Sequence, residues 1–196
     1  MYSKIESKGD YIYFIEQDAI ARGLINHSFK QKFKNKFFPV PTWKFQKQLR
    51  KLEYFNNCKK GLLITLYIKY LQFKFQKISL KLGFSIPINV FGPGLCILHY
   101  GTIVVNGNAK IGKNCRMEVC VNIGASGGKP QAPKLGDNIY IAPGVKIYGD
   151  IKLGNNIAIA ANSSVHRSFE ENNILIGGSP AKKISEIDIK RIIKHI

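Results

Sequence analysis

The feature that most constrains this chain is an aliphatic residue that recurs at six-residue intervals in its second half. The recurring residues are Ile111, Met117, Ile123, Leu135, Ile141, Ile147, Leu153, Ile159 and Val165. A period of six fits neither a helix of 3.6 residues per turn nor the two-residue alternation of a flat strand. It fits a chain that turns a corner after each short strand, so that equivalent side chains stack in one interior column. The spacing therefore predicts a repeat solenoid with a continuous apolar core.

A second set of small or aliphatic residues lies four positions after most members of the first set. Its members are Cys115, Val121, Ile139, Val145, Ile151, Ile157 and Ser163. Asn114, Asn138 and Asn155 fall between these sets, and asparagine tolerates the left-handed backbone that a tight corner requires. The two sets and the corners together predict short strands joined by tight turns.

One stretch interrupts the period. Lys129 stands where an aliphatic residue is expected, within the sequence GASGGKPQAPK. We interpret this stretch as a loop that leaves the solenoid and forms a wall or lid over a site. A tolerated surface insertion is the alternative interpretation.

The first 84 residues have a different pattern, which is helical. Helical periodicity is present in residues 11–26, in Trp43–Tyr54 and in Leu62–Leu82. In the first segment, the residues that share an apolar face are Ile12, Ile15, Ala19 and Ile20. In the last segment, much of one side is basic through Lys69, Lys74, Lys77 and Lys81. We expect its apolar side to pack on the rest of the protein; a membrane surface is the alternative.

Positive charge is concentrated in the same half of the chain. The 196 residues carry a formal net charge of +18, and 14 basic residues but one acid, Glu53, lie between Lys30 and Lys81. Such a surface attracts polyanions, although a solvated lysine-rich face is an equally simple explanation. The sequence has no RNP, zinc-finger or helix-turn-helix pattern, so nucleic acid is not an expected partner.

The cysteines and the hydropathy indicate a cytoplasmic protein. Cys58, Cys96, Cys115 and Cys120 have neither CxxC spacing nor paired histidines, which favours reduced thiols and no metal site. The sequence has no apolar run of about 18 residues and no signal-peptide pattern. We therefore expect a cytoplasmic location, with peripheral association at the inner membrane surface as a further expectation.

The motifs of the second half resemble a known family. The stretches GPGLCILHYGTIVVNGNAKIGKNCRMEVCVNIGASGG, APKLGDNIYIAPGVKIYGDIKLGNNIAIAANSSV and GGSPAKKI resemble serine acetyltransferase-like hexapeptide-repeat acyltransferases, most closely those of capsule and surface-polysaccharide synthesis. The resemblance implies a mainly β fold, a left-handed parallel β-helix, with an N-terminal α-helical region. It also implies a homotrimer, with acetyl-CoA as co-substrate in the groove between neighbouring prisms. The expected divisions are residues 1–84 (helical), 85–184 (β-helix) and 185–196 (a helical tail).

His99 is the expected catalytic residue. It is the only one of the four histidines that lies inside a patterned segment, LCILHYGTIVV, whereas His27, His166 and His195 are expected at the surface. By resemblance it matches the catalytic base of the family, with the glycine of the motif displaced to Gly101. A neutral imidazole suits this task, because transfer of an acetyl group to a hydroxyl requires removal of the hydroxyl proton.

The sequence departs from the serine enzymes at three positions around this histidine. The resemblance places acidic residues of the family at Phe84 and Leu98, and a second histidine at Ala132. Because a small zwitterion needs charged partners, these replacements argue against L-serine as the acceptor. They also leave the acid that orients His99 open, and the candidates for it are Asp18, Glu16 and Glu118.

The expected acetyl-CoA site is lined mainly by small residues and backbone. The resemblance places Ala125, Pro143, Gly144 and Ala161 along the pantetheine channel, and a backbone N–H near Gly124 beside the developing oxyanion. Lys182 and Lys183 are candidates for binding the phosphates of CoA, or else they cap the last coil as solvated cations.

These observations favour an O-acetyltransferase that moves acetyl from acetyl-CoA to a hydroxyl of an anionic saccharide, by direct attack in a ternary complex. One alternative is L-serine as the acceptor, in cysteine biosynthesis. Another is a non-catalytic basic scaffold that binds membrane or nucleic acid. The sequence does not fix the acceptor or the position that is acetylated.

Overall fold

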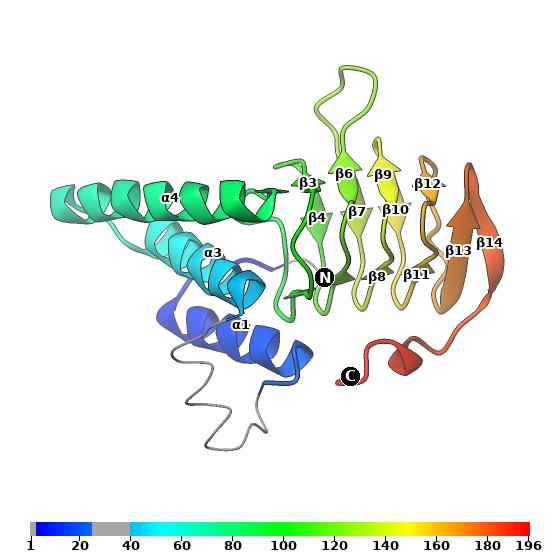
Figure 1. The fold of residues 1–196 in the computed structure, drawn as a ribbon, viewed down its shortest axis with the longest axis horizontal. Helices are drawn as coiled ribbons and strands as arrows, with labels where there is room; N and C mark the ends of the chain where they lie inside the picture. The colour runs from blue at the N-terminus through cyan, green and yellow to red at the C-terminus, as the bar shows by residue number, and fades with distance from the viewer. Residues whose placement is uncertain (1–2, 25–39) are drawn as a thin grey trace.

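The computed structural model describes residues 3–24 and 40–196. In these ranges, helices α1 (Lys8–Ala21), α3 (Pro41–Cys58) and α4 (Leu62–Leu82) precede a stack of short strands (Figure 1). The strands are β1 (Phe84–Ser85), β2 (Cys96–Ile97), β3 (Ile103–Val105), β4 (Lys110–Ile111), β5 (Arg116–Met117), β6 (Asn122–Gly124), β7 (Lys134–Leu135), β8 (Tyr140–Ile141), β9 (Lys146–Tyr148), β10 (Lys152–Leu153), β11 (Ala158–Ile159), β12 (Ser164–Val165), β13 (Ile174–Gly178) and β14 (Ala181–Glu186). A 3₁₀ turn, η1 (Ile189–Arg191), follows.

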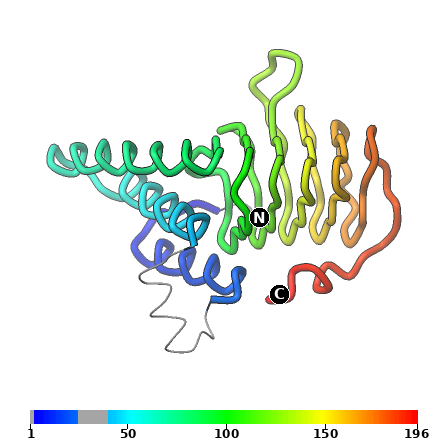
Figure 2. Tube along the Cα trace, viewed as in Figure 1, coloured from blue at the N-terminus to red at the C-terminus, as the bar shows by residue number. Residues whose placement is uncertain are grey.

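The strands form a three-sided parallel β-helix. Its sheets have the orders β1-β3-β6-β9-β12, β10-β7-β4 and β14-β13-β11-β8-β5-β2, so each sheet takes strands from successive coils. All pairs are parallel except β13–β14, where the chain reverses and ends the stack. The tube view shows the coils side by side along one axis (Figure 2). The expectation of a parallel β-helix preceded by helices is confirmed.

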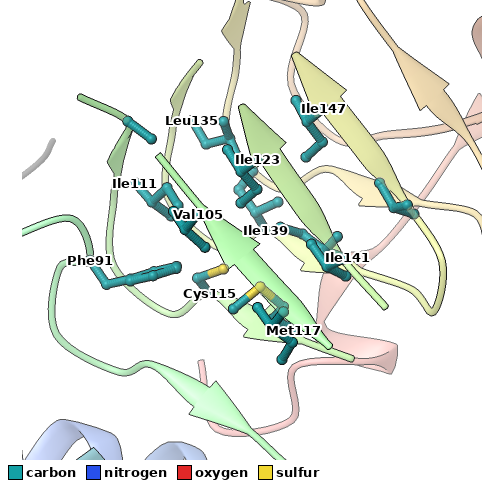
Figure 3. Packing of buried hydrophobic residues seen from close by; sticks show 14 of the residues in the cluster. Phe91, Val105, Ile111, Cys115, Met117, Ile123, Leu135, Ile139, Ile141 and Ile147 are labelled. Carbon is teal, nitrogen blue, oxygen red and sulfur yellow. The ribbon is translucent and has the colours of Figure 1, made fainter. Parts of the chain in front are cut away.

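The six-residue pattern forms the core of this β-helix. All nine recurring residues are buried, with exposed fractions of 5% or less, and so are the seven residues of the second set. Figure 3 shows members of both sets pointing into the space between the sheets. Each coil buries few side chains alone, so the apolar column is continuous only because neighbouring coils stack.

Asparagines occupy one row of corners. Asn114, Asn138, Asn156 and Asn173 have φ between 57° and 61°, the left-handed conformation that asparagine tolerates. Their side chains form a ladder, in which each Nδ2 donates to the Oδ1 of the next asparagine at 2.7–2.9 Å. The corner lies at Asn156 and not at Asn155, whose Oδ1 instead accepts from the Asp137 N–H at 2.7 Å.

Close approach of the coils makes some glycines irreplaceable. A Cβ added at Gly136 would lie 2.5 Å from the carbonyl oxygen of Gly154. A Cβ added at Gly107 would have only Pro87 carbons nearby, at 3.8 Å. We expect Gly136→Ala to lower the free energy of unfolding by about 1–3 kcal/mol, because two coils must separate. Gly107→Ala is the matched control. Urea denaturation measures both, and equal stability of the two variants would contradict this packing.

Helix α1 differs from the predicted segment at residues 11–26. It begins after Ser7, whose Oγ accepts from the Asp10 N–H at 3.0 Å, and it ends at Ala21. Residues 25 and 26 lie outside the described residues. Its buried side chains are Phe14 and Asp18, while Ile12 is 47% exposed. The predicted apolar face is therefore wrong, because α1 packs through a buried carboxylate.

Arg50 of α3 joins the helices to the first coil of the β-helix. The guanidinium is fully buried, with Nε 2.9 Å from Asp18 Oδ2 and Nη1 3.0 Å from Glu53 Oε2. Its Nη2 also donates to the Gly92 carbonyl at 2.7 Å, and Asp18 Oδ1 accepts from the Leu95 N–H at 2.8 Å. Although burial opposes the charge, the two carboxylates raise the pKa of Arg50.

Helix α4 precedes the first coil, and the C-terminal segment folds back along the β-helix toward α1. Helix α4 has the predicted bounds, and the predicted packing is confirmed on one face, where Leu71 and Leu82 are buried. Beyond β14, the predicted helical tail has only the single turn η1, and Ile189 and Ile193 pack against Ala158. The boundaries at residues 84 and 184 remain predictions. Among the described residues, no helix is both long and apolar enough to cross a membrane.

Candidate active site

His99 lies at an exposed corner between β2 and β3 whose two sides are both anchored. On one side, Gln46 of α3 accepts from the Ile97 N–H at 3.2 Å and donates to the Leu95 carbonyl at 2.5 Å. On the other side, the Gly101 N–H donates to the Leu82 carbonyl at the end of α4, at 3.0 Å. The helical region therefore holds the backbone that carries His99.

Two further side chains contact this backbone. Arg22 donates to the Ile97 carbonyl, to Gln46 Oε1 at 2.8 Å and to Thr42 Oγ1 at 3.0 Å. Thr42 Oγ1 in turn lies 3.5 Å from the carbonyl oxygen of Leu98, the residue before His99. Burial lowers the pKa of Arg22, and the Asp18 carboxylate opposes that effect.

No motif in the sequence indicates these anchoring residues. Arg22, Thr42 and Gln46 are polar side chains without a recognisable pattern around them. The signal available was their spacing, because Thr42, Gln46 and Arg50 recur every four residues on the buried face of α3. Polar residues at such positions indicate a buried hydrogen-bonded interface.

His99 shares one edge of the β-helix with the small residues expected at the acetyl-CoA site. In the register of β2 with β5, Ile97 pairs with Met117, and a Cβ at Gly101 would lie 3.4 Å from the Val119 side chain. The corner that carries His99 therefore stacks on the corner at Val119–Cys120 of the next coil. The Gly144 N–H donates to the Val119 carbonyl at 3.0 Å, and the Asn162 N–H donates to the Pro143 carbonyl at 2.9 Å. The corners that follow His99 along this edge are Val119–Cys120, Pro143–Gly144 and Ala161–Asn162.

The spacing of these corners sets the length of the edge. The corners at His99 and Ala161 are three coils apart. Because neighbouring strands lie about 4.8 Å apart, the distance between the two corners is about 14 Å. Pro143 and Ala161 are exposed, and Gly144 has φ of 77°. A Cβ at Gly144 would lie 2.1 Å from Asn162 Oδ1, so this corner accommodates only glycine. The corners of this edge are therefore built from small residues, are exposed at Pro143 and Ala161, and are joined by hydrogen bonds from one coil to the next.

The sheet β1-β3-β6-β9-β12 separates this edge from the loop that follows Ala125. Gly124 is the last residue of β6, and its carbonyl accepts from the Gly149 N–H at 3.0 Å. The chain then leaves the β-helix as a projecting loop (Figure 2), as predicted, and Asn108 Nδ2 donates to the Pro130 carbonyl at 2.8 Å. The roles predicted for the Gly124 N–H, for Ala125 and for the loop as a wall remain predictions.

Lys182 and Lys183 lie at the opposite end of the stack from His99. Both are exposed on β14, and Lys182 pairs with Gly177 of β13. A Cβ at Gly177 would lie 2.8 Å from the Cβ of Ala160, so Lys182 lies near the last corner of the edge. Lys183 forms an ion pair with Glu171. Their predicted contact with CoA phosphates remains a prediction.

The three candidate orienting acids have different environments. The carboxylate of Asp18 is bound by Arg50 and by the Leu95 N–H, and burial raises its pKa. Glu16 is exposed on α1. Glu118 is 8% exposed, lies 3.9 Å from Arg116 Nε, and follows Met117, the partner of Ile97. Strand register thus places Glu118 on the coil next to His99, and its orienting role remains a prediction.

The other histidines lie elsewhere. His166 is exposed and stacks on Tyr148 with 5.8 Å between ring centroids, whereas His27 lies outside the described residues. His195 is half-buried, contrary to expectation, because the C-terminal segment folds back along β5 and places Nε2 3.3 Å from Asn114 Oδ1. Burial lowers its pKa. It lines a cavity of about 200 Å³ between the end of α1 and the C-terminal segment.

Comparison with known proteins supports the family resemblance. No family model matches the chain. Curated relatives named serine acetyltransferase are 36% identical in Staphylococcus aureus (strain Mu50 / ATCC 700699) and 37% identical in Staphylococcus epidermidis (strain ATCC 12228), each over 89 residues. The match covers 44% of this chain and 41% of each relative, so it spans less than half the length of those relatives.

Solved structures show the same fold. Serine acetyltransferase from Brucella abortus strain S19 in complex with coenzyme A aligns with a TM-score of 0.70 and 22% identity, over 92% of this chain and 70% of that one. The Neisseria gonorrhoeae enzyme aligns with a TM-score of 0.68 and 22% identity, over 92% and 68% of the two chains. The likeness supports the left-handed winding that the resemblance implies.

The relatives also correct one expectation. Those reported above are named serine acetyltransferases, so the expectation of a saccharide acceptor, with its capsule or surface-polysaccharide role, is wrong. The error arose because uncharged residues at Phe84, Leu98 and Ala132 were taken to exclude L-serine. The chain therefore has the β-helix fold of the serine acetyltransferases and resembles these hexapeptide-repeat acyltransferases in sequence over 89 residues.

Proposed function

We propose that this chain is an acetyl-CoA-dependent O-acetyltransferase whose acceptor is the hydroxyl group of L-serine. The observation that carries the proposal is the single edge that begins at His99 and continues through the small-residue corners at Pro143–Gly144 and Ala161. The names of the relatives support L-serine, and the Brucella abortus complex with coenzyme A supports the co-substrate.

The edge fits an extended acyl thioester. Its length from His99 to Ala161, about 14 Å, gives a slender pantetheine arm a row of corners to follow. One large side chain crosses this row, because Lys146 Nζ donates to the Cys120 and Gly144 carbonyls at 2.6 and 3.1 Å. Lys182, at the far end, is available to a CoA phosphate as a point charge. A homotrimer, as the resemblance implies, would place a second prism beside this edge and turn it into a groove.

His99 supplies the chemistry in this proposal. Its neutral imidazole takes the hydroxyl proton as the serine oxygen attacks the thioester carbonyl. The C–S bond breaks as the new C–O bond is completed, and the proton passes from the imidazolium to the sulfur of the leaving CoA. The acetyl group moves directly, within a ternary complex.

Three positions that the resemblance aligns with acidic or histidine residues of the family carry no charge in this chain. Phe84 is 5% exposed, and its ring packs edge-on against Phe45 with 4.9 Å between the ring centroids. Ala132 is 3% exposed, and Leu98 is half-buried. Because a zwitterion binds weakly without charged partners, we expect L-serine to saturate the enzyme only at high concentration.

Release of CoASH from acetyl-CoA tests the proposal. We expect release that depends on L-serine, with O-acetylserine identified by mass spectrometry. L-Alanine is the matched acceptor, because it has the same charges and lacks the hydroxyl. Equal release with L-alanine, or no release with L-serine at any concentration, would contradict the proposed acceptor.

A further inference from the structure

Helix α4 has two apolar faces, and the other described residues pack against one of them. Leu71 and Leu82 are buried, and Phe75 and Ile78 pack against the core of the β-helix. The opposite face carries half of the large hydrophobic side chains that are exposed in the described residues. These are Leu62 (79% exposed), Leu63 (80%), Leu66 (61%), Tyr70 (51%), Phe73 (54%) and Leu80 (75%). Packing within residues 3–24 and 40–196 does not account for this second face.

The exposed side chains share one side of the helix. Leu63, Leu66, Tyr70, Phe73 and Leu80 follow one another at intervals of three, four, three and seven residues, which keeps them on one side of a helix. We call these five residues the outer stripe. Helix α4 extends away from the β-helix (Figure 1).

Lysines accompany the outer stripe, and in the described part of the chain none of them forms an ion pair with an acid. Lys77 lies within its line, Lys69 lies on one side, and Lys74 and Lys81 lie on the other. The sequence has no acidic residue between Glu53 and Glu118.

The lysine side chains lie along the apolar surface. Lys74 Nζ is 5.3 Å from the centre of the Tyr70 ring, and Lys77 Nζ is 4.6 Å from that of Phe73. Stems in this position cover apolar surface while the ammonium groups stay at its border. The face therefore combines exposed aromatic and aliphatic groups with uncompensated positive charge.

This combination selects among the surfaces that could cover the stripe. A second copy of α4 would bring lysine rows against lysine rows with no acid between them, and like charges beside a helix seam are repulsive. A bilayer that contains anionic lipid offers an apolar layer for the stripe and negative headgroups for the lysines. We propose that α4 lies flat on such a bilayer and docks the protein there through the outer stripe.

The proposal is independent of the acetyl-transfer activity, because it rests on α4 alone. Its test is flotation of the full chain with phosphatidylcholine vesicles, with and without phosphatidylglycerol. We expect binding to the mixed vesicles, weaker binding as salt is raised, and little binding to phosphatidylcholine alone.

Variants separate insertion of the stripe from attraction by charge. We expect Phe73→Asp and Leu80→Asp each to lower vesicle affinity by at least about tenfold. Ile184→Asp, at a side chain that is 58% exposed on β14, is the matched control and should bind like the wild type. A second pair of variants tests the attraction by charge. The first replaces the four lysines of α4 by glutamine, at Lys69, Lys74, Lys77 and Lys81. The control replaces four lysines outside α4, at Lys113, Lys134, Lys152 and Lys190.

Three results would overturn the proposal. The first is no flotation of the wild type with mixed vesicles. The second is undiminished flotation of Phe73→Asp, which would mean that charge alone attracts the protein. The third is a loss of oligomer mass in Phe73→Asp without any vesicle binding, which would assign the stripe to a second copy. Circular dichroism establishes that each variant is folded before these comparisons are made.

Discussion

Replacement of His99 by alanine is expected to lower the turnover number for L-serine acetylation by about 10²–10⁴-fold. Without the imidazole, the serine hydroxyl must lose its proton to water as it attacks the thioester. Affinity for CoA should change little, because the proposed CoA contacts are the corners at Pro143–Gly144 and Ala161. The turnover number comes from CoASH release, and calorimetric titration gives the affinity for CoA.

His166→Ala is the matched control for this experiment, since His166 is also an exposed imidazole on the β-helix. It should retain wild-type turnover. Near-normal turnover of His99→Ala would assign the proton transfer to another group. Loss of CoA affinity in parallel with turnover would instead give His99 a role in shaping the edge.

Replacement of Arg50 by methionine is expected to lower the free energy of unfolding by about 3–5 kcal/mol. The variant leaves Asp18 and Glu53 buried without their cation, and it removes the hydrogen bond to the Gly92 carbonyl of the first coil. Urea denaturation measures the loss. Lys47→Met, an exposed site on the same helix, is the control and should change stability little.

A double substitution tests whether the cost comes from the stranded carboxylates. Adding Asp18→Asn to Arg50→Met should cost less than the sum of the two single substitutions, because Asp18 then needs no cation. Arg50→Lys should restore only part of the stability, since an ammonium cannot reproduce the paired bonds to Asp18. An Arg50→Met variant with wild-type stability would contradict the role of Arg50 as the joint between helices and β-helix.

The β-helix could be predicted from the sequence because its periodicity is local. Each coil repeats the same inward positions, so a residue such as Ile141 can be assigned to the core from its spacing alone. The joint between the helices and the first coil could not be predicted in this way. Asp18 and Arg50 are 32 residues apart and meet only in the folded chain, and neither has a local pattern that marks it.

The buried carboxylate also explains the error in the first helix. Its face was assigned from apolar residues such as Ile12, whereas the structure buries Phe14 and Asp18. A hydropathy pattern does not distinguish a paired, buried carboxylate from a solvated one, because pairing depends on a partner elsewhere in the chain.

The candidate site was predictable only where residue type and pattern coincide. His99 was predicted because it lies inside a patterned segment and matches the catalytic base of the family by resemblance, and Pro143, Gly144 and Ala161 were predicted from the resemblance. Their roles remain predictions. The anchors Arg22, Thr42 and Gln46 were missed because their hydrogen bonds reach backbone far along the chain. The acceptor was wrongly assigned because groups that hold a substrate need not occupy the positions that they occupy in relatives.

The most direct test of the central claim is the NMR signal of His99 during a titration with CoA. The sequence has four histidines, so protein labelled with ¹³C at Cε1 of histidine gives a spectrum in which His99→Ala identifies the His99 signal. We expect the His99 signal to shift in proportion to the CoA bound, because the sulfur of CoA must lie beside this ring. A His99 signal that stays unchanged while CoA binds would contradict the claim that this edge of the β-helix is the acetyl-transfer site.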